Sequence, residues 1–182
     1  MRNYDLRLPY SRYFNYLNIP ETRARKRRFE EFGPTSGLKE ELDYSHEIRN
    51  MKLYRYMLSD YDEITLPKPM EGLSTNRLLT MTRIDGRKIM HFISENSDIK
   101  IRNRVAMNMF KAWYVPFYKF GVIHGDPHLG NYSIRVDGGI NLMDFGCIRI
   151  FRPDFVTGVI ELYKALRDGN EEQAVNAYKR WG

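Results

Sequence analysis

Apolar residues recur every three or four positions along several segments of the chain, and this spacing predicts helices. The longest segment runs from Ile99 to Phe120, and one face of it carries Val105, Met109, Ala112, Trp113, Pro116 and Phe120. Proline removes a backbone hydrogen bond, so we expect Pro116 to kink this helix or to end its regular part. Further helices are predicted over residues 38–58, 154–167 and 170–181.

The pattern changes to short extended runs in two parts of the chain. Residues 132–136 and 140–143 are predicted to be strands, joined by the sequence DGG, which favours a tight turn. Residues 64–69 form a short extended segment with two prolines, and residues 77–84 (RLLTMTRI) are predicted to be a strand. Helices and a small sheet in this order predict an α+β fold that is mostly helical.

Composition is typical of a single globular domain. The 182 residues are about one domain in length, and a hydrophobic content of 42% with 29% charged residues excludes a disordered chain or a membrane bundle. Cys147 is the only cysteine, which excludes a disulfide framework and an all-cysteine zinc site. The sequence contains no signal-peptide core and no apolar run long enough to span a bilayer. We therefore expect a cytoplasmic protein.

The positive charge of the chain is concentrated at its N-terminus. The net charge is +6, and residues 1–40 hold nine basic and five acidic side chains, whereas residues 151–182 hold five of each. A basic arm over residues 1–37 could bind the phosphates of a nucleotide, a nucleic acid or an anionic lipid. A solvated helix with long cationic side chains is favoured over these binding roles, because charge alone does not identify a partner.

The candidate chemistry lies in the sequences HGDPHLGN (124–131) and LMDFG (142–146). Four residues separate Asp126 from Asn131 in a loop rich in glycine and proline, and Asp144 follows across the predicted hairpin. Because a hairpin brings its ends together, we expect these three side chains to lie close to one another. Carboxylate and amide oxygens are the ligands that Mg²⁺ prefers.

The same spacing is that of phosphoryl transfer in protein kinases: an Asp, four residues, an Asn, and then Asp-Phe-Gly. In that arrangement Asp126 accepts the proton of the attacking hydroxyl group, and Asn131 and Asp144 hold Mg²⁺. Ordinary turn and capping roles for these residues are the alternative, which the combined spacing disfavours. His124 and His128 do not share a helix face, so a structural role for His124 is favoured over zinc binding.

Together with ELDYSHEIRN (41–50), these motifs resemble the UbiB/AarF family of atypical protein-kinase-like proteins, which is associated with ubiquinone biosynthesis. Aminoglycoside and choline kinases share a similar HGD loop, but the ELDY segment followed by Glu47 favours UbiB/AarF. The resemblance covers residues 38–182. It implies a helix C region over 38–58, a strand and hinge over 64–86, and the C-terminal lobe of a kinase over 87–182.

The resemblance also implies roles for individual residues. Glu41 and Asp43 match a Glu-x-Asp element of the family, and Glu47 matches the helix glutamate that pairs with a strand lysine in kinases. Asp43 and Glu47 are four positions apart, so we expect them to share a helix face. The implied cofactors are ATP and Mg²⁺, and the implied adenine-binding backbone lies in the hinge at Met81, Thr82 and Ile84.

Residues 1–37 lack three features of the family, namely its Lys-x-Gly-Gln motif, its alanine-rich loop and its Val-Ala-x-Lys strand. We therefore expect a C-terminal lobe with helix C and only part of the N-terminal lobe. Three functions remain open: a UbiB-type kinase or ATPase that supports ubiquinone biosynthesis, a small-molecule phosphotransferase, or a truncated non-catalytic pseudokinase or interaction module. The expected partners are a nucleotide and, as alternatives, quinone-synthesis proteins or an anionic membrane surface at which the chain would be peripheral; no nucleic acid is expected.

Overall fold

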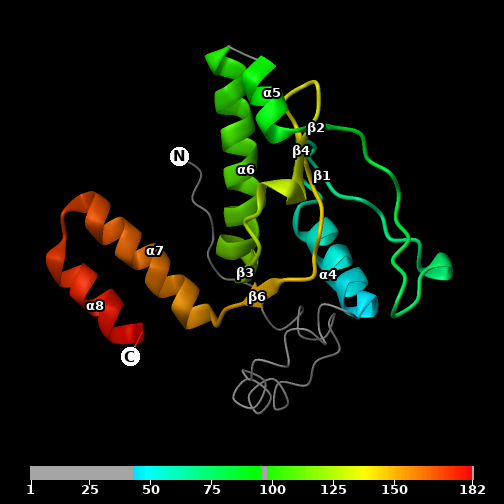
Figure 1. Cartoon of the computed structure of the whole chain (residues 1–182). Coiled ribbons are helices and arrows are strands. Elements are labelled where there is room, and N and C mark those ends of the chain that lie inside the picture. The colour runs from blue at the N-terminus through cyan, green and yellow to red at the C-terminus, as the bar shows by residue number, and fades with distance from the viewer. Residues whose placement is uncertain (1–42, 96–97, 182) are drawn as a thin grey trace.

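The structure is a computed structural model that describes residues 43–95 and 98–181. Its helices and strands confirm the expected α+β fold, which is mostly helical (Figure 1). The helices are α4 (Tyr44–Met57), α5 (Ile89–Glu95), α6 (Ile99–Phe120), α7 (Pro153–Asp168) and α8 (Glu171–Trp181), with 3₁₀ turns η1 (Glu71–Leu73) and η2 (Leu129–Asn131). The strands are β1 (Ile64–Thr65), β2 (Arg87–Lys88), β3 (Val122–His124), β4 (Tyr132–Ile134), β5 (Ile140–Leu142) and β6 (Ile148–Ile150).

The predicted hairpin is present and forms the centre of a four-stranded sheet in the order β1-β5-β4-β2. Strands β4 and β5 are antiparallel with Tyr132 opposite Leu142, and β1 runs parallel to β5 with Ile64 opposite Ile140. Every residue of β4 and β5 is buried. A second, two-stranded sheet pairs β3 with β6, which places the segments before and after the hairpin side by side. The sequence patterns did not predict this second sheet.

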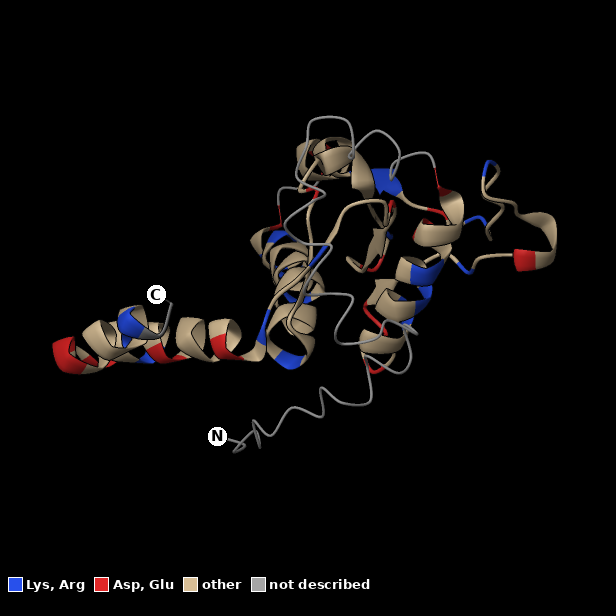
Figure 2. Cartoon of the chain, turned by 90° about the horizontal axis from the view of Figure 1, so that it is seen from below, with Lys and Arg blue, Asp and Glu red and all other residues tan. Residues whose placement is uncertain are grey.

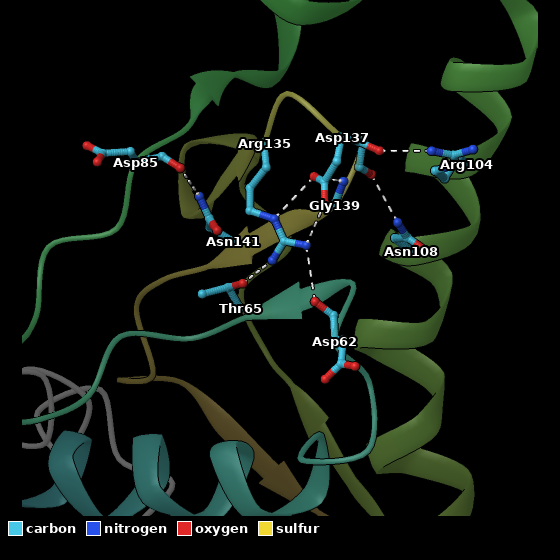
Figure 3. A network of polar contacts seen from close by, with 10 residues as sticks. Asp62, Thr65, Asp85, Arg104, Asn108, Arg135, Asp137, Gly139 and Asn141 are labelled. Carbon is cyan, nitrogen blue, oxygen red and sulfur yellow. Dashed lines mark hydrogen bonds and ion pairs between the residues drawn. The ribbon is translucent and has the colours of Figure 1, made fainter.

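A polar network fastens the hairpin turn to its neighbours (Figure 3). Arg135 donates hydrogen bonds to the Asp62 carbonyl group at 3.1 Å and to Thr65 Oγ1, and it forms an ion pair with Asp137. From α6, Asn108 donates to the Gly138 carbonyl group at 3.0 Å. Gly138 has φ of +81°, which glycine adopts without strain. The hairpin therefore has one fixed position against α6 and β1.

Helix α6 has the predicted bounds and is the longest helix among the described residues. Its N-cap is Asp98, whose side chain accepts a 2.8 Å hydrogen bond from the Lys100 backbone amide, and Gly121 ends it in the left-handed conformation. The expectation that Pro116 could end the regular helix is wrong, because α6 continues to Phe120. Pro116 is buried inside this helix.

The strand predicted over residues 77–84 is wrong. The structure contains only isolated bridges there, between Pro69 and Met81 and between Thr75 and Leu78. The Lys68 amide donates to Thr82 Oγ1 and the Thr80 amide to Ser74 Oγ, so these amides do not form the backbone hydrogen bonds of a regular ladder. The segment forms an exposed arm, and the regular strand of this region is β2, which begins after Gly86.

Helix α4 ends as predicted but begins later than expected, at Tyr44. Asp43 lies outside the helix as its N-cap and accepts a 3.0 Å hydrogen bond from the Ser45 amide. The expected common helix face of Asp43 and Glu47 is therefore wrong. The basic arm over residues 1–37, the helix start at residue 38 and Glu41 lie outside the described residues.

The two C-terminal helices project from the rest of the fold and pack on each other (Figures 1 and 2). Asn170 Oδ1 caps α8 by accepting a 3.0 Å hydrogen bond from the Gln173 amide. Acidic and basic residues both occur along this pair of helices (Figure 2). Within the described residues, no helix is both long enough and apolar enough to cross a membrane.

Candidate functional site

The hairpin brings the candidate residues together as predicted. Asn131 directly precedes β4, and its carbonyl group accepts a 2.9 Å hydrogen bond from the amide of Met143, the residue before Asp144. The Asn131 side chain donates a 2.8 Å hydrogen bond to Asp126 Oδ2. Asn131 and Asp144 therefore lie at the open end of the hairpin, before β4 and after β5, and the loop that contains Asp126 lies beside Asn131.

Asp126 is an ionised carboxylate held by its own loop. Its pKa is lowered by the hydrogen bond from the Asn131 side chain and by a second one, of 3.1 Å, from the His128 backbone amide to Oδ1. His128 is exposed, and its ring nitrogen Nδ1 accepts a 3.0 Å hydrogen bond from the Gly130 amide. These contacts fix the direction of the Asp126 carboxylate.

Asp144 adopts an unusual backbone conformation, with φ of +64°. It is the only described residue other than glycine with positive φ. Its carbonyl oxygen is hydrogen-bonded to His124 Nε2, and its Oδ1 accepts a 3.0 Å hydrogen bond from the Gly146 amide. A left-handed backbone persists where its surroundings impose it, which is common at functional sites.

His124 has the structural role that the sequence favours. It is buried, and its Nδ1 accepts a 3.3 Å hydrogen bond from the Asp126 amide while Nε2 contacts the Asp144 carbonyl group. One imidazole ring therefore connects the two candidate segments. Within residues 43–95 and 98–181, no group of three or more His, Cys, Asp or Glu side chains could hold a metal ion.

Helix α4 holds the residue that follows Asp144. Glu47 Oε1 accepts a 3.2 Å hydrogen bond from the Phe145 amide, and Asn50 Nδ2 donates a 2.8 Å hydrogen bond to the Phe145 carbonyl group. The Phe145 ring is fully buried and contacts Tyr54, with 5.5 Å between ring centroids. Burial raises the pKa of Glu47 despite the hydrogen bond from Phe145, and the nearby charge of Asp144 raises it further.

Beneath the Asp126 loop, Trp113 of α6 donates a hydrogen bond to the hydroxyl group of Tyr132. Burial raises the pKa of Tyr132 to about 12, and the Asp126 charge acts in the same direction. The Trp113 ring also lies 6.2 Å from the His124 ring, centroid to centroid. Trp113 was predicted only as a core residue, and the structure adds this polar contact to its packing role.

The predicted hinge residues lie on the exposed arm. The bridge between Pro69 and Met81 lies between two backbone hydrogen bonds. One runs from the Met70 amide to the Thr80 carbonyl group, and the other from the Thr82 amide to the Lys68 carbonyl group. In an antiparallel pair of this kind, the backbone groups of Met81 point away from the partner segment and are available to a ligand. The Thr82 amide is already engaged, and Ile84 is half-buried.

One contact ties the arm to the hairpin. Asn141 of β5 donates a 2.9 Å hydrogen bond to the Asp85 carbonyl group, as Figure 3 shows. Gly86 packs so closely that a Cβ atom there would lie 2.5 Å from Ser133 Oγ. The C-terminal end of the arm is therefore attached to the strand that leads to Asp144.

The donor set fits a hard divalent cation. The hydrogen bonds described above leave Asn131 Oδ1 and Asp144 Oδ2 without a donor among the described residues. Both are oxygen atoms of the kind that Mg²⁺ prefers, and two protein ligands leave room for phosphate oxygens. Asp144 is exposed, so a nucleotide can reach it.

Sequence reasoning missed Asn50 and Tyr132 as parts of the site. Asn50 lies three positions after Glu47, and a polar residue on the predicted buried face of a helix was the available signal. Tyr132 carried no such signal, because its hydroxyl group contacts a residue of another element.

Comparisons with known proteins agree with the motifs. A family model described as the ABC1 atypical kinase-like domain matches residues 13–178, which begins upstream of the motifs considered above. The mitochondrial atypical kinase COQ8 of Saccharomyces cerevisiae is 30% identical over 135 residues, and the match covers 72% of this chain and 26% of the yeast protein. The mitochondrial atypical kinase coq-8 of Caenorhabditis elegans is 24% identical over 150 residues, which cover 80% of this chain and 20% of that protein.

A solved structure supports the fold. The complex of Rv3197 with erythromycin from Mycobacterium tuberculosis superimposes with a TM-score of 0.63 at 20% sequence identity. The match covers 76% of this chain and 35% of that chain. This chain spans 20% to 35% of the length of these three proteins.

Proposed function

The chain belongs to the ABC1 atypical kinase-like domain family, and on that premise we propose that it binds ATP with Mg²⁺ and transfers or hydrolyses the terminal phosphoryl group. The observation that carries this proposal is the hydrogen bond between Asn131 and Asp126 at the end of the hairpin that leads to Asp144. This arrangement supports phosphoryl transfer because it combines a fixed carboxylate with two free oxygen ligands.

Asp126 would orient the attacking hydroxyl group or water. Its lowered pKa makes it a weak base, so it accepts the proton late, after the bond to phosphorus has largely formed. Asn131 would have two functions, because its amide nitrogen holds Asp126 and its Oδ1 would be available to bind Mg²⁺. Asn131 and Asp144 would hold Mg²⁺, which when bound neutralises charge on the phosphates.

The outward-facing backbone of Met81 is the proposed contact for adenine, with Thr82 and Ile84 beside it. A contact through the Thr82 amide would require the loss of its bond to Lys68. Asp43 and Glu41 remain proposed members of the nucleotide site. We expect the chain to bind the nucleotide weakly, because residues 1–37 contain no Val-Ala-x-Lys sequence that would supply the lysine partner of Glu47.

We extend the proposal to the biological role. The resemblance to the UbiB/AarF family supports a role in isoprenoid quinone biosynthesis, with quinone-synthesis proteins and an anionic membrane surface as partners. The two COQ8 relatives are named as mitochondrial, which is compatible with a peripheral position at an inner membrane.

Turnover of ATP tests the catalytic part of this proposal. Phosphate release by the full chain should depend on Mg²⁺ and should fall at least about 100-fold in Asp126→Asn, within the usual range for the loss of a general base. Asp60→Asn is a matched control, because Asp60 is exposed and lies outside the site. Equal rates in Asp126→Asn and the wild type would contradict the assignment of Asp126.

A further inference from the structure

Asn50 is a buried amide in a helix whose other buried positions are apolar. Its side chain is 6% exposed, and the buried residues around it on α4 are Ile48, Met51, Leu53, Tyr54 and Met57. A buried amide costs free energy unless it is hydrogen-bonded, and Asn50 donates both to the Phe145 carbonyl group and towards His46 Nδ1, at 3.3 Å. The long-range contact of Asn50 is therefore with the segment after Asp144.

The Phe145–Gly146 peptide group is held at both ends. Its carbonyl oxygen accepts the 2.8 Å hydrogen bond from Asn50, and its N–H donates the 3.0 Å hydrogen bond to Asp144 Oδ1. The two bonds form a continuous chain from the Asn50 amide through one peptide group to the Asp144 carboxylate. Each bond polarises the peptide group in the sense that strengthens the other.

Gly146 lowers the steric cost of a flip of the Phe145–Gly146 peptide group. A peptide flip changes ψ of Phe145 and φ of Gly146, and glycine accepts either sign of φ at little steric cost. After a flip, the carbonyl group would leave Asn50 and the N–H would leave Asp144 Oδ1. The Glu47 bond to the Phe145 amide belongs to the preceding peptide group, so it does not prevent this flip.

We propose that Asn50 is a positioning residue that fixes the Phe145–Gly146 peptide group and thereby holds Asp144 Oδ1, so that Oδ2 faces the metal. The proposal rests on the proposed function, in which Asp144 is a ligand of Mg²⁺. Asn50 touches neither the nucleotide nor the metal in this account. It acts through one peptide group and one carboxylate oxygen.

The test replaces Asn50 in the full chain and follows two separate signals. Asn50→Leu keeps the volume of the side chain and removes the donor, and Met57→Ala is the matched control. Met57 is buried on the same helix, about 10 Å further along its axis, and its truncation lowers stability while it removes no hydrogen bond to Phe145. The signals are hydrogen exchange of the Gly146 amide without metal, followed by NMR, and binding of Mn²⁺ with ADP, followed by electron paramagnetic resonance.

In Asn50→Leu we expect the Gly146 amide to exchange at least about 10-fold faster and Mn²⁺·ADP affinity to fall about 10-fold or more, a change of about 1.4 kcal/mol. Met57→Ala should lower the melting temperature and leave both signals near the wild type. Adding Gly146→Ala to Asn50→Leu should restore part of the affinity, because alanine disfavours the positive φ of a flipped peptide and its Cβ would lie 3.4 Å from Asp144 Oδ1, an ordinary contact.

Equal effects of Asn50→Leu and Met57→Ala on both signals would overturn the positioning role. If the wild type itself binds no Mn²⁺·ADP, the proposed function fails. The role of Asn50 is then decided by the Gly146 amide, and unchanged exchange in Asn50→Leu would overturn it. Should Asn50→Leu fail to fold, Asn50→Ser removes the reach of the donor with a smaller and more polar side chain, and the same outcomes apply.

Discussion

Glu47 of α4 accepts a hydrogen bond of 3.2 Å from the backbone amide of Phe145, 98 positions later in the chain. The contact attaches helix α4 to the residue that follows Asp144. It also places a half-buried carboxylate near the Asp144 charge, and burial raises the pKa of Glu47. The same contact therefore supports the site and introduces a charge that costs stability when ionised.

Glu47→Gln tests this cost. A raised pKa in the folded state means that the folded protein binds the proton more tightly, so the free energy of unfolding falls as pH rises through the interval between the unfolded and folded pKa. Glutamine keeps the oxygen that accepts from Phe145 and removes the charge. Without metal, the melting temperature of Glu47→Gln should exceed that of the wild type at pH 7 to 8.

The difference should shrink as pH falls and should vanish below about pH 4, near the pKa of glutamate in an unfolded chain. Thermal denaturation at a series of pH values measures it. A difference in melting temperature that is independent of pH, or a less stable Glu47→Gln protein at neutral pH, would contradict the electrostatic account.

Gly86→Ala should detach the arm from the hairpin. A Cβ atom at residue 86 would lie 2.5 Å from Ser133 Oγ and 2.6 Å from Asn141 Nδ2, which donates to the Asp85 carbonyl group. Overpacking of this kind costs about 1–3 kcal/mol of the free energy of unfolding, which denaturant titration measures. Gly72→Ala is the control, because a Cβ atom there meets nothing within 4 Å. Equal stabilities of the two variants would contradict the close packing at Gly86.

The hydrogen bond from Trp113 to Tyr132 should contribute to stability beneath the Asp126 loop. Tyr132→Phe leaves the Trp113 indole N–H without this partner and should cost about 1–2 kcal/mol. Trp113→Phe removes the donor and part of the buried ring. A double-mutant cycle from chemical denaturation should return a coupling energy of about 1 kcal/mol, whereas a value near zero would show that the two side chains act independently.

The sequence predicted the elements whose signals are local. The regular apolar stripe and the flanking Asp98 and Gly121 define α6, and its predicted bounds are correct because both ends are set by nearby residues. The hairpin was predicted from the DGG turn between two short strands, and the meeting of its ends followed from geometry alone. Asp126 and Asn131 were expected to lie close together because both belong to one short loop, residues 124–131.

What the sequence could not predict depends on distant partners. The pairing of β3 with β6 joins two three-residue strands about 25 positions apart, and neither has a distinctive pattern. RLLTMTRI has the composition of a strand, but the hydroxyl groups of Thr82 and Ser74 accept the amide hydrogen bonds of Lys68 and Thr80 that a regular ladder would use. Asn50 and Tyr132 join the site through contacts that only the folded chain creates.

The most direct test of the central claim is a calorimetric titration of ATP into the full chain, with Mg²⁺ and with EDTA, for the wild type, Asp144→Asn and Asp60→Asn. We expect weak binding by the wild type, with a dissociation constant above the micromolar range, that requires Mg²⁺. Asp144→Asn should lose the dependence on Mg²⁺, because the amide replaces a charged ligand, and Asp60→Asn should behave as the wild type. Binding of ATP that is equal with and without Mg²⁺ in the wild type, or unchanged in Asp144→Asn, would contradict the account.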